Sequence, residues 1–176
     1  MLRPSELSEG EWIEINFEYA TWTIPAKRRK LLQHLKQANR PEDVHIVPLS
    51  QQALKILHEL HQYTGKGKYI FPSLRGNSRP ISNNTIRAAL RTMGFDNTVI
   101  TTHGFRGTAS TFLNTLGYRR DVIEAQLSHK DKNTIRSAYN HADYMQERQI
   151  MLQEWADYLD SLRMGAKVIP LKSINY

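Results

Sequence analysis

Two short stretches of this chain combine histidine, arginine and tyrosine, side chains that could carry out chemistry on a phosphate. In TTHGFRGTAS, His103 and Arg106 are three residues apart, and in LSHKDKNTIRSAYNHADY, Tyr139 follows His129 by ten residues. Arginine offers a planar fork of donors that matches two phosphate oxygens, and histidine can move a proton near neutral pH. Three interpretations compete for these residues: core packing, a passive nucleic-acid surface, or chemistry on a phosphate.

His103 and Arg106 lie at the predicted start of a helix, which Thr101 or Thr102 could cap. The apolar residues that recur at helical spacing after this start are Phe105, Ala109, Phe112, Leu113 and Leu116, and Gly117 ends the pattern. His103 and Arg106 fall outside this stripe and would project from the helix. Unpaired N–H groups in a first helical turn favour an anion, so the pair could bind a phosphate and do acid/base work. A solvated pair at a helix start is the alternative.

The choice of a nucleophile is open on local chemistry alone. A tyrosine phenol has a pKa near 10, so it attacks a phosphate only with the help of nearby cations or a base, and such cations would also stabilise the charge that develops on the phosphate. Tyr139 lies among such residues, but Tyr144 is close by, and His141 could be mistaken for His129. Most of the eight tyrosines must be packing residues.

The sequence predicts neither a metal nor a cofactor. There is no cysteine, which excludes disulfides and Cys-based metal sites. His129 and His141 are too far apart for one helical face, and no acidic residue stands at a convincing ligand spacing. GKGK at residues 65–68 lacks the spacing and the Ser/Thr of a phosphate-binding loop.

Composition points to an anionic partner. The 176 residues suffice for one compact domain, and the formal net charge of +7 with a pI of about 9.7 favours nucleic acid. The polar N-terminus is not a secretory signal, and no apolar run approaches the length of a membrane span. We therefore expect a soluble, intracellular protein with no membrane partner.

The first third of the chain predicts a small antiparallel sheet. Residues 11–17, 19–24 and 45–49 read as strands because apolar and polar residues alternate or because the run is short and apolar. Residues 25–41 are polar and basic and could form a long loop or a short helix. Residues 69–71 read as a short extended piece and residues 73–80 as a polar loop.

Helices dominate the rest, so the predicted fold class is α+β and mostly helical, with a three-stranded antiparallel sheet packed on a helical bundle. Ser50 could cap a helix over 51–63, and Ser82 one that runs to Arg91 and ends at Gly94. Further helices are expected over 121–127, 133–139 and 143–162, with a stripe of Met151, Leu152, Trp155, Leu159 and Leu162 in the last. The tail AKVIPL reads as a lone strand, which could dock onto a neighbouring protomer or onto its own sheet.

Taken in order, several phrases of this sequence resemble the tyrosine recombinases of the phage integrase family, especially prophage integrases of the satellite-phage type. They are RPSEL at Arg3–Leu7, HGFR at His103–Arg106, LSH at Leu127–His129, and Tyr139, together with WTIPAKRRK, HIVPLS and SAYNHADY. The resemblance covers nearly the whole chain, from Arg3 to about Leu162. His-x-x-Arg alone is a weak signal, but the ordered set with its spacing is strong.

The resemblance implies a role for each matching residue. Arg3, supported by Glu6, is similar to the family's first phosphate-binding arginine, and Arg106 to its second. His103 matches the acid/base histidine, His129 the residue that bonds the scissile phosphate, and Tyr139 the nucleophile. The family's lysine, which protonates the leaving 5′ oxygen, is best matched by Lys30, with Lys27 as the alternative. The segment between Lys30 and His45 is longer than usual, and Ser128 replaces a common glycine.

The implied reaction is cleavage and rejoining of DNA through a 3′-phosphotyrosyl link, without metal or ATP. The implied partners are double-stranded DNA and three further protomers in a tetramer on DNA, with the isolated domain a monomer or weak dimer in a bacterial, nucleoid-associated setting. Residues 1–176 would form the catalytic domain, without the family's first helices and N-terminal DNA-binding domains, and residues 164–176 its tail. Rival hypotheses are a type IB topoisomerase-like enzyme, a DNA-binding module that no longer cuts, and a chance match.

Overall fold

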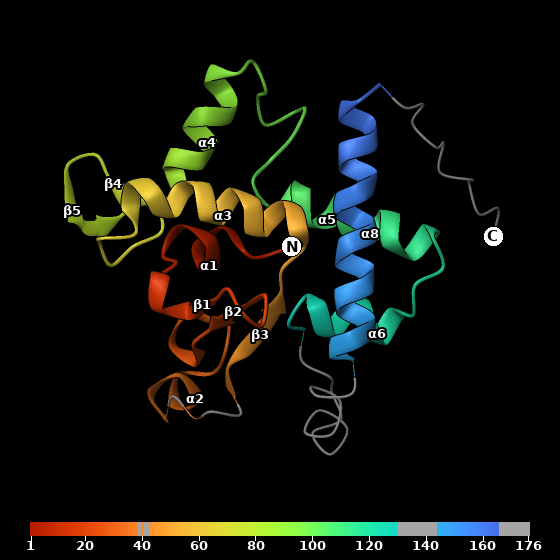
Figure 1. Cartoon of the computed structure of the whole chain (residues 1–176), viewed down its shortest axis with the longest axis horizontal. Helices are drawn as coiled ribbons and strands as arrows, with labels where there is room; N and C mark the ends of the chain where they lie inside the picture. The colour runs from red at the N-terminus through yellow and green to blue at the C-terminus, as the bar shows by residue number, and fades with distance from the viewer. Residues whose placement is uncertain (39, 41–42, 130–143, 166–176) are drawn as a thin grey trace. The chain divides into compact units, whose positions relative to one another are not determined.

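The computed structural model describes residues 1–38, 40, 43–129 and 144–165 (Figure 1). Contacts between residues divide the chain into two compact units, Met1–Arg106 and Gly107–Tyr176. Two predicted elements, the helix over 133–139 and the strand in the tail, lie outside the described residues.

The first unit contains the predicted antiparallel sheet. Its strands are β1 (Ile15–Asn16), β2 (Thr21–Ile24) and β3 (His45–Pro48), in the order β1-β2-β3. Trp22 of β2 lies opposite Ile15 on one side and Val47 on the other. Alternation along β2 buries Trp22 and Ile24, and Pro25 follows the last strand residue. The predicted three-stranded sheet is confirmed.

The predicted strand over residues 11–17 is mostly wrong. Only residues 15 and 16 pair as a strand, and Trp12–Glu14 form a 3₁₀ turn, η1. The Glu14 carboxylate accepts hydrogen bonds from the Glu11 backbone N–H at 3.2 Å and from Trp22 Nε1 at 3.1 Å. These two bonds fold the chain into a turn that buries Trp12 and leaves the Ile13 side chain 90% exposed.

In two basic or polar stretches of the first unit, the structure confirms the short-helix alternative for residues 25–41 and corrects the prediction for residues 73–80. Residues 25–41 contain a second 3₁₀ turn, η2 (Ala26–Arg28), and a short helix, α2 (Gln33–Ala38). The predicted loop at 73–80 is instead a hairpin of β4 (Pro72–Ser73) and β5 (Gly76–Pro80). Gly76 has a φ of 140°, a conformation open to glycine, and this permits the tight reversal.

Three helices complete the first unit: α1 (Pro4–Ser8), α3 (Gln51–Thr64) and α4 (Asn83–Thr92). Ser50 caps α3 as predicted, because its side chain accepts from the Ala53 N–H at 3.3 Å. Ser82 occupies the same position before α4 but its hydroxyl contacts Thr85 Oγ1 at 3.1 Å instead of a backbone N–H. The apolar core of this unit consists of Trp12, Trp22, Ile24, Val47, Leu57 and Ile70.

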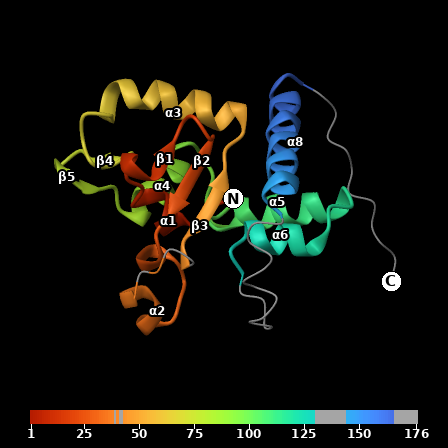
Figure 2. The same ribbon diagram turned by 60° about the horizontal axis from the view of Figure 1, so that its bottom comes forward.

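The second unit is built from helices. They are α5 (Gly104–Thr115), whose start up to Arg106 belongs to the first unit, α6 (Arg120–Gln126) and α8 (Met145–Arg163). α6 contacts α8 (Figure 2), and the Phe112 ring of α5 stacks on Tyr158 of α8 at 4.0 Å. The buried apolar residues here are Ala109, Phe112, Leu113, Val122, Ile123, Leu127, Met151 and Leu152.

The predicted apolar stripes of α5 and α8 are only partly buried. The middle of the α5 stripe is buried, but Phe105 is 50% and Leu116 46% exposed, because Arg106 and not Phe105 is the buried residue of the first turn. On α8, Met151 and Leu152 are buried while Leu159 is 45% exposed. The helices themselves are confirmed near their predicted bounds, as is the α+β, mostly helical class.

A buried polar pair joins α6 to α8. Arg148 is 1% exposed, and its Nε donates a hydrogen bond of 2.9 Å to Oε1 of Gln126, which is fully buried. Burial lowers the pKa of Arg148 to about 10, so the guanidinium still carries its charge at neutral pH. A charge held out of water in this way fixes the contact between the two helices, because few other arrangements would satisfy it.

Candidate active site

Arg3 immediately precedes α1 and is held by Glu6. The Glu6 carboxylate, which is fully buried, accepts from the Arg3 backbone N–H at 2.8 Å and from Arg3 Nη1 at 2.7 Å. Pro4, at the first helical position, suits this start because its φ is already helical. The Arg3 side chain is 17% exposed. The contact predicted between Arg3 and Glu6 is therefore present, and part of the Arg3 side chain remains exposed.

Arg106 does not project freely from α5 as its position outside the stripe suggested. The residue is 5% exposed, and its Nη1 donates a 2.7 Å hydrogen bond to the backbone carbonyl of Met1. This bond spans 105 residues of sequence and brings Arg106 beside the segment that contains Arg3. The prediction failed because the partner of Arg106, the Met1 carbonyl, is far away in sequence, and helical periodicity cannot reveal such a partner.

The Met1 amino group responds to the charges of both Arg106 and Glu6. Burial, and then the Arg106 guanidinium, lower the pKa of the Met1 amino group to about 6, while the Glu6 carboxylate acts in the opposite direction. Arg106 contacts Met1 through its hydrogen bond to the Met1 carbonyl, two residues before Arg3, and Arg3 is in turn bonded to Glu6. Arg106 is thus held next to the segment of Arg3 and Glu6, and the sequence singled out all three residues.

His103 immediately precedes α5 and is exposed. Thr101 provides the cap, because its Oγ1 accepts from the Gly104 N–H at 3.0 Å. The His103 carbonyl accepts from the Arg106 N–H at 3.1 Å. His103 thus stands directly before the first helical turn, which contains Arg106, with the imidazole exposed and Arg106 buried.

The two candidate lysines, Lys27 and Lys30, are exposed and flank two arginines whose side chains are little exposed. Arg28 pairs with the Glu14 carboxylate and donates to the Glu6 carbonyl at 3.2 Å. Arg29 donates to the carbonyls of Asp43 and, at 3.2 Å, Val44. Exposure alone does not separate Lys30 from Lys27.

His129 belongs to the second unit, where it follows α6. Ser128 has a φ of 52° and is buried, which turns the chain at the end of the helix. His129 Nδ1 lies 2.6 Å from Glu124 Oε2, and its side chain is 47% exposed. A carboxylate only accepts hydrogen bonds, so Nδ1 is the donor in this contact. Sequence reasoning missed Glu124.

Tyr139 and His141 lie outside the described residues, but Tyr144 does not. The Tyr144 hydroxyl donates to Asp121 Oδ2 at 2.9 Å, and the Arg119 guanidinium lies 5.2 Å from the ring centroid. The hydrogen bond to Asp121 raises the pKa of the Tyr144 phenol. A phenol that is harder to ionise and is already bonded to a carboxylate is a poor nucleophile.

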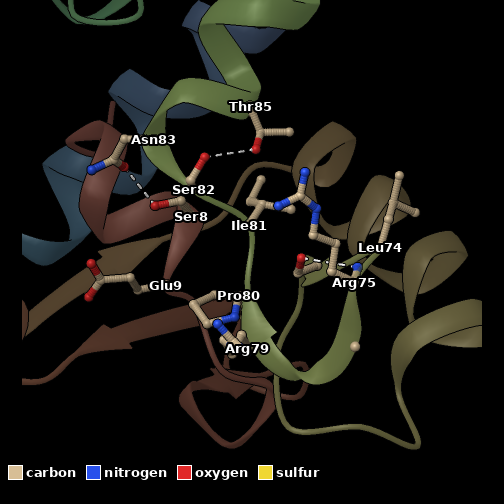
Figure 3. A pocket seen from close by; sticks show the side chains of 12 residues that line it. Ser8, Glu9, Leu74, Arg75, Arg79, Pro80, Ile81, Ser82, Asn83 and Thr85 are labelled. Atoms are coloured by element: carbon tan, nitrogen blue, oxygen red, sulfur yellow. Dashed lines mark hydrogen bonds between the residues drawn. The ribbon is translucent and has the colours of Figure 1, made fainter.

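A basic groove of about 980 Å³ lies between the β4–β5 hairpin and the start of α4 (Figure 3). Arg75 and Arg79 of the hairpin line it, and Glu9 is an acidic member of the lining. Ser8 Oγ of α1 bonds Asn83 Oδ1 of α4 at 2.8 Å, which fixes one wall. The sequence analysis did not predict this groove because it treated residues 73–80 as a loop. The two arginines in that stretch were the signal that could have indicated a basic surface.

Within the described residues, no three His, Asp or Glu side chains gather where they could hold a metal ion. In the same part of the chain, no helix is long and apolar enough to cross a membrane.

Comparison with known proteins identifies the family. The Phage integrase family matches residues 1–146. The chain is 42% identical over 167 residues to prophage integrase IntA of Escherichia coli (strain K12), covering 95% of this chain and 38% of that protein. It is 40% identical over 167 residues to the integrase of Enterobacteria phage P4 (92% and 38% covered) and 41% identical over 165 residues to prophage integrase IntZ of Escherichia coli (strain K12) (93% and 38% covered).

The chain spans about two fifths of the length of these curated relatives. No solved structure matches it. Since the family match covers most of the 176 residues, this chain belongs to the phage integrase family.

Proposed function

We propose that this chain is the catalytic part of a site-specific DNA recombinase that cuts and rejoins DNA through a covalent tyrosine link, for prophage integration or excision. The observation that carries the proposal is the meeting of Arg106 with the segment of Arg3 and Glu6, across 105 residues of sequence, in a fold of the integrase family. Two arginines held next to the same segment suit a phosphate, because each guanidinium can donate to two of its oxygens.

In the proposed reaction, Tyr139 Oη attacks a DNA phosphorus and the P–O5′ bond breaks. The phenolic proton passes to a base, for which His103 is the candidate, and Lys30 gives a proton to the departing 5′ oxygen. The phosphate remains joined to the 3′ end through tyrosine, and a 5′-hydroxyl of a second strand reverses the step. Because the covalent link preserves the bond energy, the cycle requires neither ATP nor a metal.

Arg3, Arg106 and His129 would stabilise the negative charge of the transition state. The contact with Glu124 determines which ring nitrogen of His129 is left to bond the phosphate. With Nδ1 donating to Glu124, a neutral ring can only accept at Nε2, so a hydrogen bond to phosphate from Nε2 requires the doubly protonated ring. Glu124 orients the imidazole, which is the part that carboxylate partners of catalytic histidines commonly take.

The proposed partner is double-stranded DNA, and the active assembly is four protomers on two duplexes. The groove lined by Arg75 and Arg79 supports DNA binding, as does the net charge of +7, since phosphates are bound mainly by arginine and lysine.

The test is covalent capture. The full chain is incubated with duplexes that carry one 5′-bridging phosphorothiolate, in which sulfur replaces the leaving oxygen, between randomised bases. A thiol ionises with a pKa of about 8.5, so it leaves readily, and the adduct accumulates because the released thiol reattacks poorly. We expect a denaturation-resistant protein–DNA adduct, and sequencing the captured DNA gives the preferred site.

Two tyrosine variants identify the nucleophile. Tyr139→Phe should abolish the adduct and leave DNA binding intact, whereas Tyr144→Phe should still form it. An adduct that persists in Tyr139→Phe and disappears in Tyr144→Phe would reverse the assignment. No adduct from the unmodified chain with any duplex, despite binding, would favour a module that binds DNA without cutting it.

A further inference from the structure

The four basic residues 27–30 divide into two kinds. Lys27 and Lys30 are exposed, whereas the Arg28 side chain and Arg29 are each only 6% exposed. Burial of a guanidinium is unfavourable unless hydrogen bonds and an opposite charge compensate for the lost water. Four consecutive cations on a solvated loop would all be exposed, so the two arginines have a specific structural task.

Arg28 connects three separate elements of the first unit. Its Nη2 pairs with the Glu14 carboxylate, which also accepts from Trp22 Nε1 of β2 at 3.1 Å. Its Nη1 donates to the backbone carbonyl of Glu6, in α1, at 3.2 Å. The guanidinium therefore ties its own segment to the sheet and to α1 at once, which a fork of fixed geometry can do and a single ammonium cannot.

Glu6, whose carbonyl accepts from Arg28, is also the residue that holds Arg3. The Glu6 side chain accepts twice from Arg3 while its carbonyl accepts from Arg28. Arg3 and Arg28 are thus anchored to the same residue, and Lys30 follows Arg28 by two positions.

Arg29 adds a second tether, next to Lys30. It donates to the carbonyls of Asp43 and Val44, immediately before β3. Burial lowers the pKa of the Arg29 guanidinium. The carboxylates of Asp43 and Glu6 act against this shift, whereas the positive charge of Arg3 adds to it. The segment is therefore close enough to Arg3 and Glu6 for their charges to act on it.

We propose that Arg28, through its pair with Glu14, is a positioning residue that holds Lys30 at a fixed place relative to the phosphate-binding Arg3. The inference rests on the proposed function, because Lys30 matters only if a 5′ oxygen leaves. Arg28 itself would touch neither the DNA nor the reacting atoms. The defect caused by its loss should therefore resemble the loss of the lysine and not the loss of a phosphate ligand.

Changing the leaving atom from oxygen to sulfur gives a ratio of reaction rates that a purely structural defect would not change. An oxygen leaving group needs a proton from the lysine, whereas a sulfur leaving group does not, because thiols are far more acidic than alcohols. The initial rate of adduct formation is measured on two duplexes of the captured sequence, one with oxygen and one with sulfur at the 5′-bridging position. The ratio of the two rates reports only on proton delivery to the leaving group.

Lys30→Ala should slow the oxygen duplex by about 10²-fold or more and the sulfur duplex little. Arg28→Lys, which keeps the charge but loses the fork, should slow the oxygen duplex at least about tenfold, with a near-normal rate on sulfur. Glu14→Gln, which keeps the shape of the partner but not its charge, should show the same rescue by sulfur. Arg148→Lys is the matched control: it removes another buried guanidinium and should change both rates in equal proportion or neither.

The outcomes separate the inference from the function on which it rests. If the unmodified chain forms no adduct on either duplex, the proposed function fails. If it does, and Lys30→Ala is rescued by sulfur while Arg28→Lys and Glu14→Gln slow both duplexes equally or neither, the positioning role is overturned and the function stands. Lys30→Ala without rescue also overturns it. Circular dichroism checks folding, and if Arg28→Lys does not fold, Glu14→Gln decides alone.

Discussion

At the residue scale, the candidate site contains two charged side chains that the fold removes from water. Glu6 is fully buried, and Arg106 is 5% exposed. Each is bonded: Glu6 to Arg3, and Arg106 to the carbonyl of Met1. A buried, hydrogen-bonded charge has little freedom to move, and preorganised donors stabilise a transition state better than donors that must first be ordered.

The first prediction concerns the guanidinium of Arg106. In Arg106→Lys the positive charge remains, but the planar fork is lost, so we expect the rate of adduct formation to fall by about 10²-fold or more. Affinity for the captured duplex should change by only about threefold, because the salt-dependent contacts are spread over many phosphates. Single-turnover kinetics and fluorescence anisotropy measure the two quantities.

Two comparisons make this prediction sharp. Arg163→Lys, at a side chain that is 78% exposed, is the control and should alter neither quantity. Equal losses in rate and affinity for Arg106→Lys would contradict a transition-state role. The sulfur duplex should not rescue Arg106→Lys, in contrast to Lys30→Ala, because Arg106 is proposed to bind the phosphate and not to protonate the leaving atom.

At the element scale, the helix starts are set by local chemistry that can be tested directly. Ser50 and Ser82 both stand one residue before a helix, but only Ser50 accepts a hydrogen bond from a backbone N–H, that of Ala53 at 3.3 Å. An N-cap side chain satisfies a donor that the helix itself leaves unpaired. The same residue type at the same position should therefore contribute differently to stability.

The second prediction is that Ser50→Ala lowers the free energy of unfolding by about 1 kcal/mol. Ser82→Ala, the matched control, should lower it by less than about 0.5 kcal/mol, the usual range of a surface change. Urea denaturation followed by circular dichroism measures both variants. Equal losses for the two serines would show that Ser82 caps α4 in solution.

The same scale shows what the sequence could predict. Period-two alternation and Pro25 located β2, and a serine cap with an apolar side located α3, because both signals are local. The turn at Trp12–Glu14 escaped prediction, since it depends on hydrogen bonds from Trp22 and Glu11 to Glu14. The β4–β5 hairpin escaped because polar strands carry little periodicity.

For the candidate site, the sequence pointed to the functional residues but not to the partners that hold them. Its residues were selected by an ordered set of motifs, and their proposed roles remain predictions. The partners that hold them, such as Glu14 for Arg28 and Glu124 for His129, carry no signal of their own, because an acidic residue in a helix or turn is ordinary until the fold places a cation beside it.

At the scale of the whole molecule, the net charge of +7 can contribute to DNA binding only where cationic side chains remain accessible. Several arginines are committed to internal contacts, as Arg28, Arg29 and Arg148 show. Arg75 and Arg79, in contrast, line an open groove of the first unit. We therefore expect such groove residues, and not the total charge, to determine how the chain holds DNA.

The last prediction tests this through salt dependence. Binding to phosphates releases counterions, so the logarithm of the association constant falls linearly with the logarithm of salt concentration, with a slope of about −0.9 for each phosphate contact. The double variant Arg75→Ala/Arg79→Ala should therefore weaken binding and make the slope shallower by roughly 2. Affinities are measured by anisotropy over a salt series, in a Tyr139→Phe background so that no adduct forms.

A matched control separates local contacts from net charge. The double variant Lys55→Ala/Arg163→Ala also removes two exposed cations, but neither of them lines the groove. If only phosphate contacts matter, its slope stays that of the parent, since screened charges at a distance contribute little at physiological ionic strength. If both double variants flatten the slope equally, the chain attracts DNA through its overall charge, and the groove loses its claim to be the binding surface.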